Sequence, residues 1–527
     1  MNKRLLSLFI MFIAGFTILQ ARLFMLMTDN LTEEASSSQS IYKTTVAQSR
    51  PDFFDCNGTR ITGAGITDYA VLFPGDKSSY NVMSYLDSGG SDSLLKGIGG
   101  NTPILLPLLA TMPADSFIDT VKVRDRYAEN QTAAHLIGYL DYDNKGVSGL
   151  ESAFEEYFSK NIINTIMEVE VNAQQIPLDG VKPRIYNSGI GGAGVELTID
   201  LRIQKVCEQI ADKMMKSGAI VVVDSNNGEI KAMVSRPNFD PADIAGAIES
   251  GNSALVNRAM TAYNVGSIYK PIIAACALGA GIDSEFGFEC TGSVEVDGQS
   301  YSCNNGTAHG QMNVETALIN SCNTYFIALG QRLGSEAVFN VASAIGAGRR
   351  IMLYDGFSTS CANMPTVSEL NKYGELCNHC FGQGKLLLTP LHVAAATNSI
   401  ANKGNYIDLT LVKKVGDSVC KAGAHREVFE SESARSVAAF MAKVVSEGTG
   451  KNAEPENTTA AGKTGTAQTG SYNSDGTERV IGWFTGWFPA ESPKYTVVVM
   501  TEDEGYGFES AAPIFAQIAD ELTLRVY

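Results

Sequence analysis

Ser267-Ile268-Tyr269-Lys270, followed by the apolar run PIIAACALGAG (residues 271–281), decides the fold of this 527-residue chain. The same tetrapeptide, SIYK, also occurs at residues 40–43. A serine is a useful nucleophile only when a base takes its proton. A lysine can be that base only when burial or nearby positive charge lowers its pKa. The surroundings of each copy therefore indicate which one carries chemistry.

The second copy has surroundings that favour a neutral lysine. Gly266 precedes it, and the run after Lys270 is apolar on all sides, which predicts a buried helix. Pro271 fits the first turn of a helix, where its missing N–H costs least. Residues three apart share one face of a helix, so Ser267 and Lys270 can meet. We predict that Ser267 is a nucleophile and Lys270 its base.

The first copy has the opposite surroundings. It ends a polar stretch, TEEASSSQS (residues 32–40), and leads into the polar, strand-like TTVAQSRPDFF (residues 44–54). A lysine in that setting is solvated and protonated. We therefore interpret residues 40–43 as a chance occurrence.

Two further motifs follow the second copy. Ser321-Cys322-Asn323 lies between helical segments in VETALINSCNTYFIALGQRLG (residues 314–334), where a hydroxyl and an amide can point into one cleft. Lys463-Thr464-Gly465-Thr466 lies in TAAGKTGTAQTG (residues 459–470). On an edge strand the side chains of Lys463 and Gly465 would face the same way. Gly465 would then leave room for a substrate backbone alongside the strand.

S-x-x-K, S-x-N and K-T-G in this order form the triplet of the penicillin-recognising serine acyl-transferases. The chain resembles a class B penicillin-binding protein, a monofunctional peptidoglycan D,D-transpeptidase, from about Arg50 onward. Pro51 departs from the family pattern, which has a glycine after this arginine. The other matching stretches are SRPDFFDCNGTRITG (residues 49–63), HLIGYLDYDNKGVSGLE (residues 135–151), AIVVVDSNNGEIKAMVSRPNFDP (residues 219–241), His309-Gly310 and GQGKLLLTP (residues 382–390).

The resemblance assigns roles to five catalytic residues. Ser267 attacks the carbonyl of the penultimate D-Ala of a stem peptide, and Lys270 takes its proton. Ser321 passes a proton to the leaving amine. Asn323 holds the substrate amide and the Lys270 amine, and Lys463 supplies positive charge. β-Lactams mimic the D-Ala-D-Ala end and are expected to trap Ser267.

The resemblance also assigns the binding residues of the K-T-G strand. Thr464 and Thr466 are expected to contact the substrate carboxylate, with Gly465 between them. The backbone N–H groups of Ser267 and Thr466 match the family's oxyanion hole. We expect no cofactor to be required for catalysis.

The start of the chain predicts a transmembrane signal anchor at residues 1–27. Lys3 and Arg4 precede a mostly apolar run, residues 5–21, which residues 23–27 extend past Arg22. About 20 apolar residues span a bilayer, and we find no clear cleavage site after the run. Basic residues before the span favour a cytoplasmic N-terminus. We expect a single-pass protein of the cell membrane, with its catalytic domain extracytoplasmic.

The rest of the chain is expected to hold a tether and two domains. Residues 28–40 read as the tether, residues 41–194 as a β-rich membrane-proximal pedestal or dimerisation domain, and residues 195–527 as the transpeptidase domain. The glycine-rich NSGIGGAG (residues 187–194) marks the boundary. Strands, then helices, then strands and one helix predict an α+β fold, an antiparallel sheet with a helical cluster. By resemblance, this catalytic fold is serine β-lactamase-like.

Charge and motifs exclude several functions and leave alternatives. The net charge of −17 and the absence of a long basic run argue against nucleic acid. The partners implied by the resemblance are stem peptides, lipid-linked precursors, β-lactams, the membrane and a membrane glycosyltransferase of a division or elongation complex. A membrane-bound β-lactamase or β-lactam sensor, or a catalytically silent scaffold, would share the triplet. An esterase triad is disfavoured because no G-x-S-x-G is present.

The chain has ten cysteines, an unusual number for an exported protein. Cys290 and Cys303 flank a hairpin-like stretch and could pair. Cys377 and Cys380 have the C-x-x-C spacing of a zinc site, with His379 between them and Cys361 upstream. A structural zinc ion on Cys361, Cys377, His379 and Cys380 is one hypothesis for this segment. Free or disulfide-bonded thiols on a loop are the other.

Overall fold

The computed structural model divides the chain into two compact units, which are described separately. One unit comprises residues 1–50, 65–126 and 160–191, and the other comprises residues 51–64, 127–159 and 192–527. The structure describes residues 3–28 and 41–526, except 64, 73–81, 87, 98–103, 113–118, 173–177, 179–180, 182, 190, 283–285 and 474. The predicted tether therefore lies outside the described residues, apart from its first residue.

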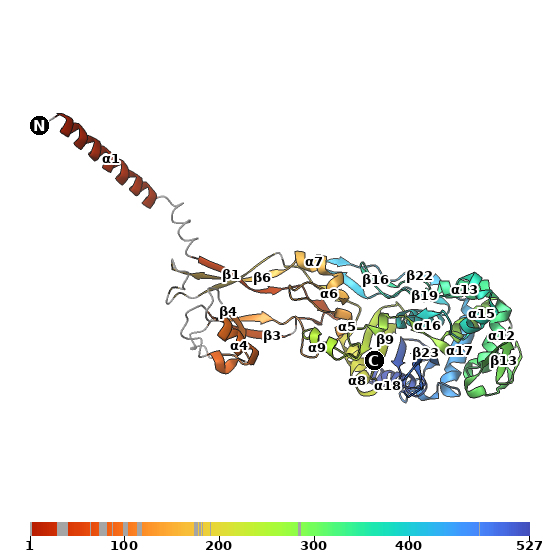
Figure 1. Cartoon of the computed structure of the whole chain (residues 1–527). Coiled ribbons are helices and arrows are strands. Elements are labelled where there is room, and N and C mark those ends of the chain that lie inside the picture. Colours follow the sequence, from red (N-terminus) through yellow and green to blue (C-terminus); the bar gives the residue numbers. More distant parts are fainter. Residues whose placement is uncertain are drawn as a thin grey trace. The chain divides into compact units, whose positions relative to one another are not determined.

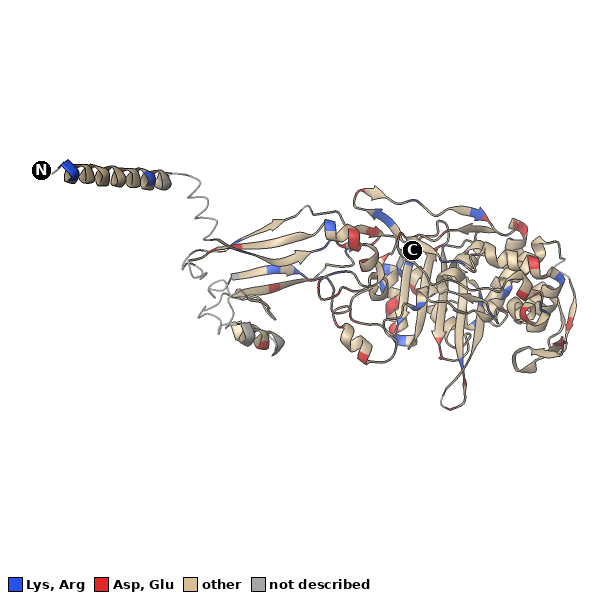
Figure 2. Cartoon of the chain, turned by 45° about the horizontal axis from the view of Figure 1, so that its top comes forward, with Lys and Arg blue, Asp and Glu red and all other residues tan. Residues whose placement is uncertain are grey.

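Helix α1 (Lys3–Thr28) covers the predicted anchor. Residues 3–25 are long and apolar enough to cross a membrane, and none of this window is buried within the protein. Lysine and arginine lie towards the two ends of the helix, and no acidic residue falls between them (Figure 2). This arrangement is typical of a helix whose apolar length is stabilised by lipid.

The first unit contains two antiparallel three-stranded sheets, which agrees with the prediction of a β-rich region. One sheet has the order β1-β6-β7 and the other β4-β3-β5. One small apolar core surrounds Leu72 and Leu106 of the second sheet, and another joins Val71 and Val121 of that sheet to Met167 and Val169 of the first sheet. The elements are β1 (Ile41–Ser49), β3 (Ile66–Leu72), η1 (Met83–Tyr85), α4 (Ser88–Gly97), β4 (Ile104–Pro107), β5 (Asp119–Arg124), β6 (Ile163–Glu170) and β7 (Arg184–Ser188).

The second unit is built on an antiparallel five-stranded sheet with the order β10-β9-β25-β24-β23. Its strands alternate between two cores, because successive side chains of a strand point to opposite faces. In β9, Val221 and Val223 join one core, whereas Ile220 and Val222 join the other. The strands are β9 (Gly218–Asp224), β10 (Ile230–Arg236), β23 (Ala461–Tyr472), β24 (Glu478–Phe488) and β25 (Tyr495–Glu502).

Helices cover both faces of this sheet (Figure 1). Helices α8 (Leu201–Met214) and α18 (Ala511–Val526) pack on one face. Helices α16 (Pro390–Ala401) and α17 (Ser431–Ser446) contribute to the core on the other face, together with α10 (Lys270–Gly279). This is the predicted antiparallel sheet with a helical cluster.

The remaining helices and short strands surround this framework. The helices are α5 (Ala134–Ile137), α6 (Gly149–Ala153), α7 (Glu155–Lys160), α9 (Ile244–Glu249), α11 (Val314–Ile319), α12 (Asn323–Leu333), α13 (Ser335–Ala344), α14 (Val367–Leu370) and α15 (Tyr373–Cys380), with the 3-10 turns η2 (Arg258–Met260), η3 (Gly266–Tyr269), η4 (Asn304–Gly306) and η5 (Lys451–Ala453). The short strands are β2 (Phe53–Phe54), β8 (Val195–Leu197), β11 (Tyr263–Asn264), β12 (Phe288–Cys290), β13 (Ser293–Val296), β14 (Gln299–Ser302), β15 (Gly310–Met312), β16 (Met352–Tyr354), β17 (Phe357–Ser358), β18 (Leu387–Leu388), β19 (Asn405–Ile407), β20 (Val412–Val415), β21 (Ser418–Val419) and β22 (His425–Glu427).

The division between the units differs from the single boundary expected at residue 194. The change at residues 191–192 is close to it, but residues 51–64 and 127–159 belong to the second unit. Strand β2 pairs in parallel with β8. The rings of Phe53, Phe154 and Phe158 are fully buried and lie 5.1–5.9 Å apart. These apolar contacts join segments that the linear order separates.

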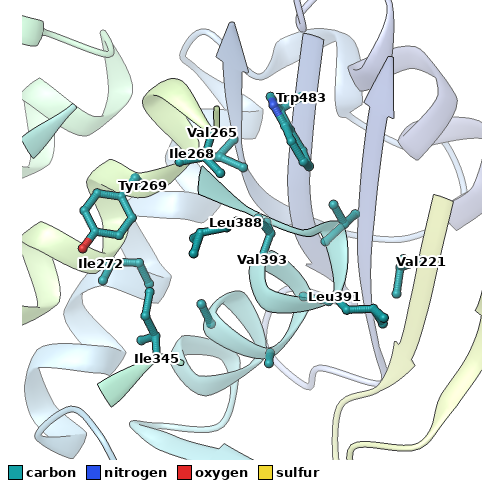
Figure 3. Packing of buried hydrophobic residues seen from close by; sticks show 14 of the residues in the cluster. Val221, Val265, Ile268, Tyr269, Ile272, Ile345, Leu388, Leu391, Val393 and Trp483 are labelled. Atoms are coloured by element: carbon teal, nitrogen blue, oxygen red, sulfur yellow. The ribbon is translucent and has the colours of Figure 1, made fainter. Parts of the chain in front are cut away.

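Turn η3 packs tightly against edge strand β23. A Cβ atom on Gly465 would lie 2.9 Å from Ile268 Cγ2 and 3.1 Å from the Ile268 nitrogen. Gly266 has a φ of +61°, and a Cβ atom there would lie 2.6 Å from the carbonyl oxygen of Thr466. Ile268 and Tyr269 fill the core behind the turn together with Val265 and Ile272 (Figure 3).

We predict that Gly465→Ala lowers the free energy of unfolding by about 1–3 kcal/mol, the usual cost of overpacking. The added methyl group forces η3 and β23 apart, because its nearest neighbours are backbone and a buried side chain. Thermal denaturation of the purified protein measures this. Gly279→Ala is the matched control, since a Cβ atom there meets nothing closer than 3.8 Å. Equal melting temperatures for the two variants would contradict the prediction.

Candidate active site

The second SIYK copy forms a 3-10 turn that runs directly into a buried helix. Ser267 lies in η3 and is half-buried, and Lys270 begins α10 with no exposed surface. Side chains at positions i and i+3 of a 3-10 turn eclipse one another. The turn therefore keeps Ser267 and Lys270 on one face of the chain, which is the condition for the predicted pairing of the hydroxyl with the amine.

The first copy lies in a different setting, as expected. Ser40 falls outside the described residues, and residues 41–43 belong to strand β1. The Lys43 side chain is 55% exposed and pairs with Glu168 at 3.1 Å. Hydrogen bonds that Lys43 donates to Tyr186 and Glu168 raise the pKa of Lys43. A protonated, exposed lysine cannot act as the base.

The Lys270 amine is held by the S-x-N motif. Its Nζ donates to the carbonyl oxygen of Ser321 at 2.6 Å and to Oδ1 of Asn323 at 2.7 Å. It also lies 3.2 Å from Ser321 Oγ. A neutral amine has two N–H groups, which these two acceptors occupy. Its lone pair is then left for a hydroxyl proton.

Ser321 lies between two lysines. Its hydroxyl accepts a hydrogen bond from Lys463 Nζ at 3.0 Å in addition to the Lys270 contact. Its backbone has a φ of +54°, a left-handed conformation that is uncommon outside glycine. The residue occupies the turn between α11 and α12, where the sequence predicted it.

Lys463 lies on edge strand β23 and is fully buried. Its Nζ also donates to the carbonyl oxygen of Thr464 at 3.0 Å. Among the described residues, no carboxylate lies within ion-pair distance of Lys270 or Lys463. Two buried amines without a counter-charge favour their neutral forms.

Burial shifts the pKa of both amines downward. Burial lowers the pKa of Lys270 to about 7, against a smaller opposing effect of Cys322 and Cys303. The pKa of Lys463 lies well below its usual value because of burial and because of the charge of Lys270. At neutral pH a large fraction of Lys270 is therefore available to accept a proton.

The position of Gly465 on the K-T-G strand contradicts the prediction that this glycine leaves room for a substrate backbone. Lys463 and Gly465 do face the same way on an edge strand, but Gly465 faces Ile268 and Val265 of the protein itself. Its missing side chain is needed for packing against η3. The Thr464 hydroxyl donates to Thr449 at 3.3 Å, and the Thr466 hydroxyl accepts from the Gly507 N–H at 3.1 Å.

Gly382 is a positioning residue that the sequence analysis quoted without giving it a role. Its carbonyl oxygen accepts a hydrogen bond of 2.8 Å from the Gly266 N–H. Its φ is +80°, and a Cβ atom there would collide with the backbone of Gly266. The GQG segment therefore lies directly behind the nucleophile turn. The G-x-G spacing of this segment was the sequence signal that could have indicated its positioning role.

The predicted zinc ligands Cys361, Cys377, His379 and Cys380 do not assemble. Cys361 is exposed, whereas the other three lie buried on helix α15. His379 Nε2 lies 3.2 Å from the Tyr269 hydroxyl, and Cys380 packs closely against Gly330 of α12. This hypothesis is wrong because the helix uses these side chains for packing, and Cys361 lies on a separate exposed segment.

A family model of the penicillin-binding protein transpeptidase domain matches residues 218–520, which include all three motifs. The chain belongs to the penicillin-binding protein transpeptidase family. Within it, the chain is 29% identical to stage V sporulation protein D of Bacillus subtilis over 409 residues. That match covers 73% of this chain and 61%, less than two thirds, of the relative.

Two further comparisons agree. Peptidoglycan D,D-transpeptidase MrdA of Haemophilus influenzae is 27% identical over 457 residues, covering 75% of this chain and 68% of the relative. A solved structure described as "Structural coordination of polymerization and crosslinking by a peptidoglycan synthase complex" matches with a TM-score of 0.72 at 22% identity. The match covers 99% of this chain and 98% of the chain in the solved structure. The predicted family and α+β fold are confirmed.

We predict that acylation by a β-lactam slows as the pH falls below about 7. Only the neutral amine of Lys270 can accept the Ser267 proton, and its lowered pKa keeps it neutral above about 7. Lowering the pH protonates the amine and removes the base. Stopped-flow labelling of the detergent-solubilised protein with a fluorescent penicillin measures the profile.

Lys270→Arg is the control for this pH profile. Arginine stays protonated at all accessible pH values, so the variant should acylate at least about a hundredfold more slowly, with no rise in rate near pH 7. Wild-type rates in the arginine variant would rule out Lys270 as the base.

Proposed function

We propose that this chain crosslinks peptidoglycan through a Ser267 acyl-enzyme. The observation that carries the proposal is the convergence of two buried lysine amines on the hydroxyl of Ser321, beside the turn that bears Ser267. This arrangement supplies a base, a proton relay and a second amine, whose charged form the approach of a substrate carboxylate would favour. It favours acyl transfer over a catalytically silent scaffold, which would not need two buried amines.

In the first half-reaction, Ser267 Oγ bonds to the carbonyl carbon of the penultimate D-Ala while its proton moves to Lys270. The peptide bond to the terminal D-Ala breaks. Ser321 passes a proton to the departing amine, because it contacts both lysines. In the second half-reaction, the amine of another stem peptide attacks the ester, releases Ser267 and forms the crosslink.

The remaining residues hold the substrate. Asn323 fixes the Lys270 amine at 2.7 Å and is available to the substrate amide. Lys463, together with Thr464 and Thr466, binds the terminal carboxylate of the stem peptide. The backbone N–H groups of Ser267 and Thr466 stabilise the oxyanion, and the close approach of Gly266 to Thr466 supports this pairing. Losing one such donor costs about 3 kcal/mol in other enzymes.

Replacement of the nucleophile tests the proposal. Ser267→Ala should lose all covalent labelling by a fluorescent penicillin, and should release no D-Ala from a stem-peptide donor, because no acyl-enzyme can form. Gel fluorescence and amino-acid analysis of the full-length protein in detergent measure the two outcomes. Ser40→Ala, in the chance copy of the motif, should label like wild type. Residual labelling of Ser267→Ala would show that another residue is the nucleophile.

We further propose that α1 anchors the chain with its catalytic domain outside the cell. Lys3 and Arg4 before the apolar span favour a cytoplasmic N-terminus. Lipid-linked precursors and a membrane glycosyltransferase would then be partners of this extracytoplasmic domain. The solved peptidoglycan synthase complex with the same fold supports that pairing.

Protease added to cells stripped of their wall tests this orientation. We expect digestion of the catalytic domain, whereas a tag fused before Lys3 should stay protected until the membrane is dissolved. A cytoplasmic enzyme detected in the same samples is the control for leakage. Protection of the catalytic domain would reverse the proposed orientation.

A further inference from the structure

The nucleophile turn η3 is fastened at both of its ends to one short segment at the end of helix α15. At the start of the turn, the Gly266 N–H donates to the carbonyl oxygen of Gly382 at 2.8 Å. At its end, the Tyr269 hydroxyl lies 3.2 Å from Nε2 of His379. The segment is itself closed, because the Gly382 N–H donates to the carbonyl oxygen of His379 at 3.0 Å. Ser267 lies between the two fixed ends.

The contact between Tyr269 and His379 is sealed from solvent. The side chains are 1% and 0% exposed, and their rings pack edge to face with centroids 5.2 Å apart. Among the described residues, no hydrogen bond reaches His379 Nδ1, so the Tyr269 hydroxyl is the polar group that orients this ring. No water can replace a lost partner here, and the remaining one would be left buried and unpaired.

The imidazole of His379 is neutral and suited to this contact. Burial lowers its pKa to about 4, so the ring carries no charge at physiological pH. A neutral imidazole has one N–H donor and one acceptor nitrogen, and a phenolic hydroxyl can donate or accept. The pair can therefore form its hydrogen bond without an ionised group beside the turn.

Helix α15 is a firm support for the turn because it packs tightly on helix α12. A Cβ atom on Gly330 of α12 would lie 2.0 Å from the Cys380 sulfur. Cys377 and Ile327 are buried in one apolar cluster between the same two helices. Helix α12 begins at Asn323. One helix thus supports both the nucleophile turn and the helix that carries the amide of the S-x-N motif.

We propose that His379 is a positioning residue for the nucleophile and acts through Tyr269. The proposal rests on the proposed function, in which Ser267 is the nucleophile. The bond to Tyr269 fixes the end of η3, where the chain enters α10 at Lys270. Transfer of the serine proton requires the hydroxyl and the amine to stay within hydrogen-bond reach. Because His379 lies behind the turn, its loss should slow the chemical step and leave binding unchanged.

Two substitutions of His379 separate positioning from packing. The amide of glutamine reaches about as far as Nε2, whereas that of asparagine reaches only about as far as Nδ1 and cannot meet Tyr269. His379→Asn should lower the first-order rate constant of acylation by a fluorescent penicillin about tenfold, with the dissociation constant of the initial complex unchanged. His379→Gln should keep a rate constant close to that of wild type. Stopped-flow labelling of the full-length protein in detergent, over a range of penicillin concentrations, gives both constants.

Tyr269→Phe tests the same contact from the other side. It removes one oxygen atom and keeps the ring, so the test does not depend on how well the histidine variants fold. It should slow acylation as much as His379→Asn, and the double variant should be no slower, because all three lose one and the same bond. His392→Asn is the matched control, since His392 is also fully buried but bonds the Thr389 hydroxyl at 2.8 Å. That variant should lower the melting temperature and leave the rate constant unchanged.

Several outcomes would overturn the positioning role. A wild-type rate constant in Tyr269→Phe would do so, and so would additive losses in the double variant. Equal losses in the asparagine and glutamine variants would assign His379 to packing alone, and a change confined to the dissociation constant would assign it to binding. None of these outcomes bears on the nucleophile itself. Labelling of Ser267→Ala, measured separately, is the result that would remove the proposed function.

Discussion

Two buried lysine amines share one serine hydroxyl, and the catalytic region of this protein depends on that contact. Lys270 and Lys463 come from a helix and from an edge strand, and they meet at Ser321 Oγ at 3.2 and 3.0 Å. Burying an ammonium ion without a counter-charge is costly, so the fold stabilises the neutral amines instead. The helical cluster and the sheet must therefore close on each other tightly enough to exclude water from both.

Glycines make this closure possible. Gly465 on β23 and Gly266 in η3 bring two backbones together at a distance that a methyl group would prevent. Gly382 supports the turn from behind through its carbonyl oxygen. The same contacts set the position of the Ser267 and Thr466 N–H groups. A packing requirement and a catalytic requirement thus fall on the same residues.

The S-x-N turn holds Ser321 in a left-handed backbone conformation. Such conformations persist only where the surroundings impose them. Here the helix start at Asn323, the two lysines and the buried Cys322 surround the residue.

Motif order was enough to predict the family and the α+β class and to propose five catalytic residues, because each motif is a local pattern with a chemical requirement. Local pattern also separated the two SIYK copies, since the apolar run after Lys270 predicts burial and the polar one after Lys43 does not. The role of Gly465 could not be derived in this way, because the atoms that it avoids belong to Ile268, far away in the sequence.

The incorrect prediction of a zinc site at the C-x-x-C segment shows the same limit of local sequence patterns. The C-x-x-C spacing on helix α15 is a local signal, and packing used those side chains for the core. A different set of side chains does converge: Cys290, Cys303, His309 and Cys322. They are spread over residues 290–322, and the pairing of β12 with β15 and the turn before α12 bring them together. The sequence by itself determined the family of the chain and the order of its three motifs. The tertiary structure alone decided which distant side chains meet, because convergence depends on strand register and helix packing, which no short motif encodes.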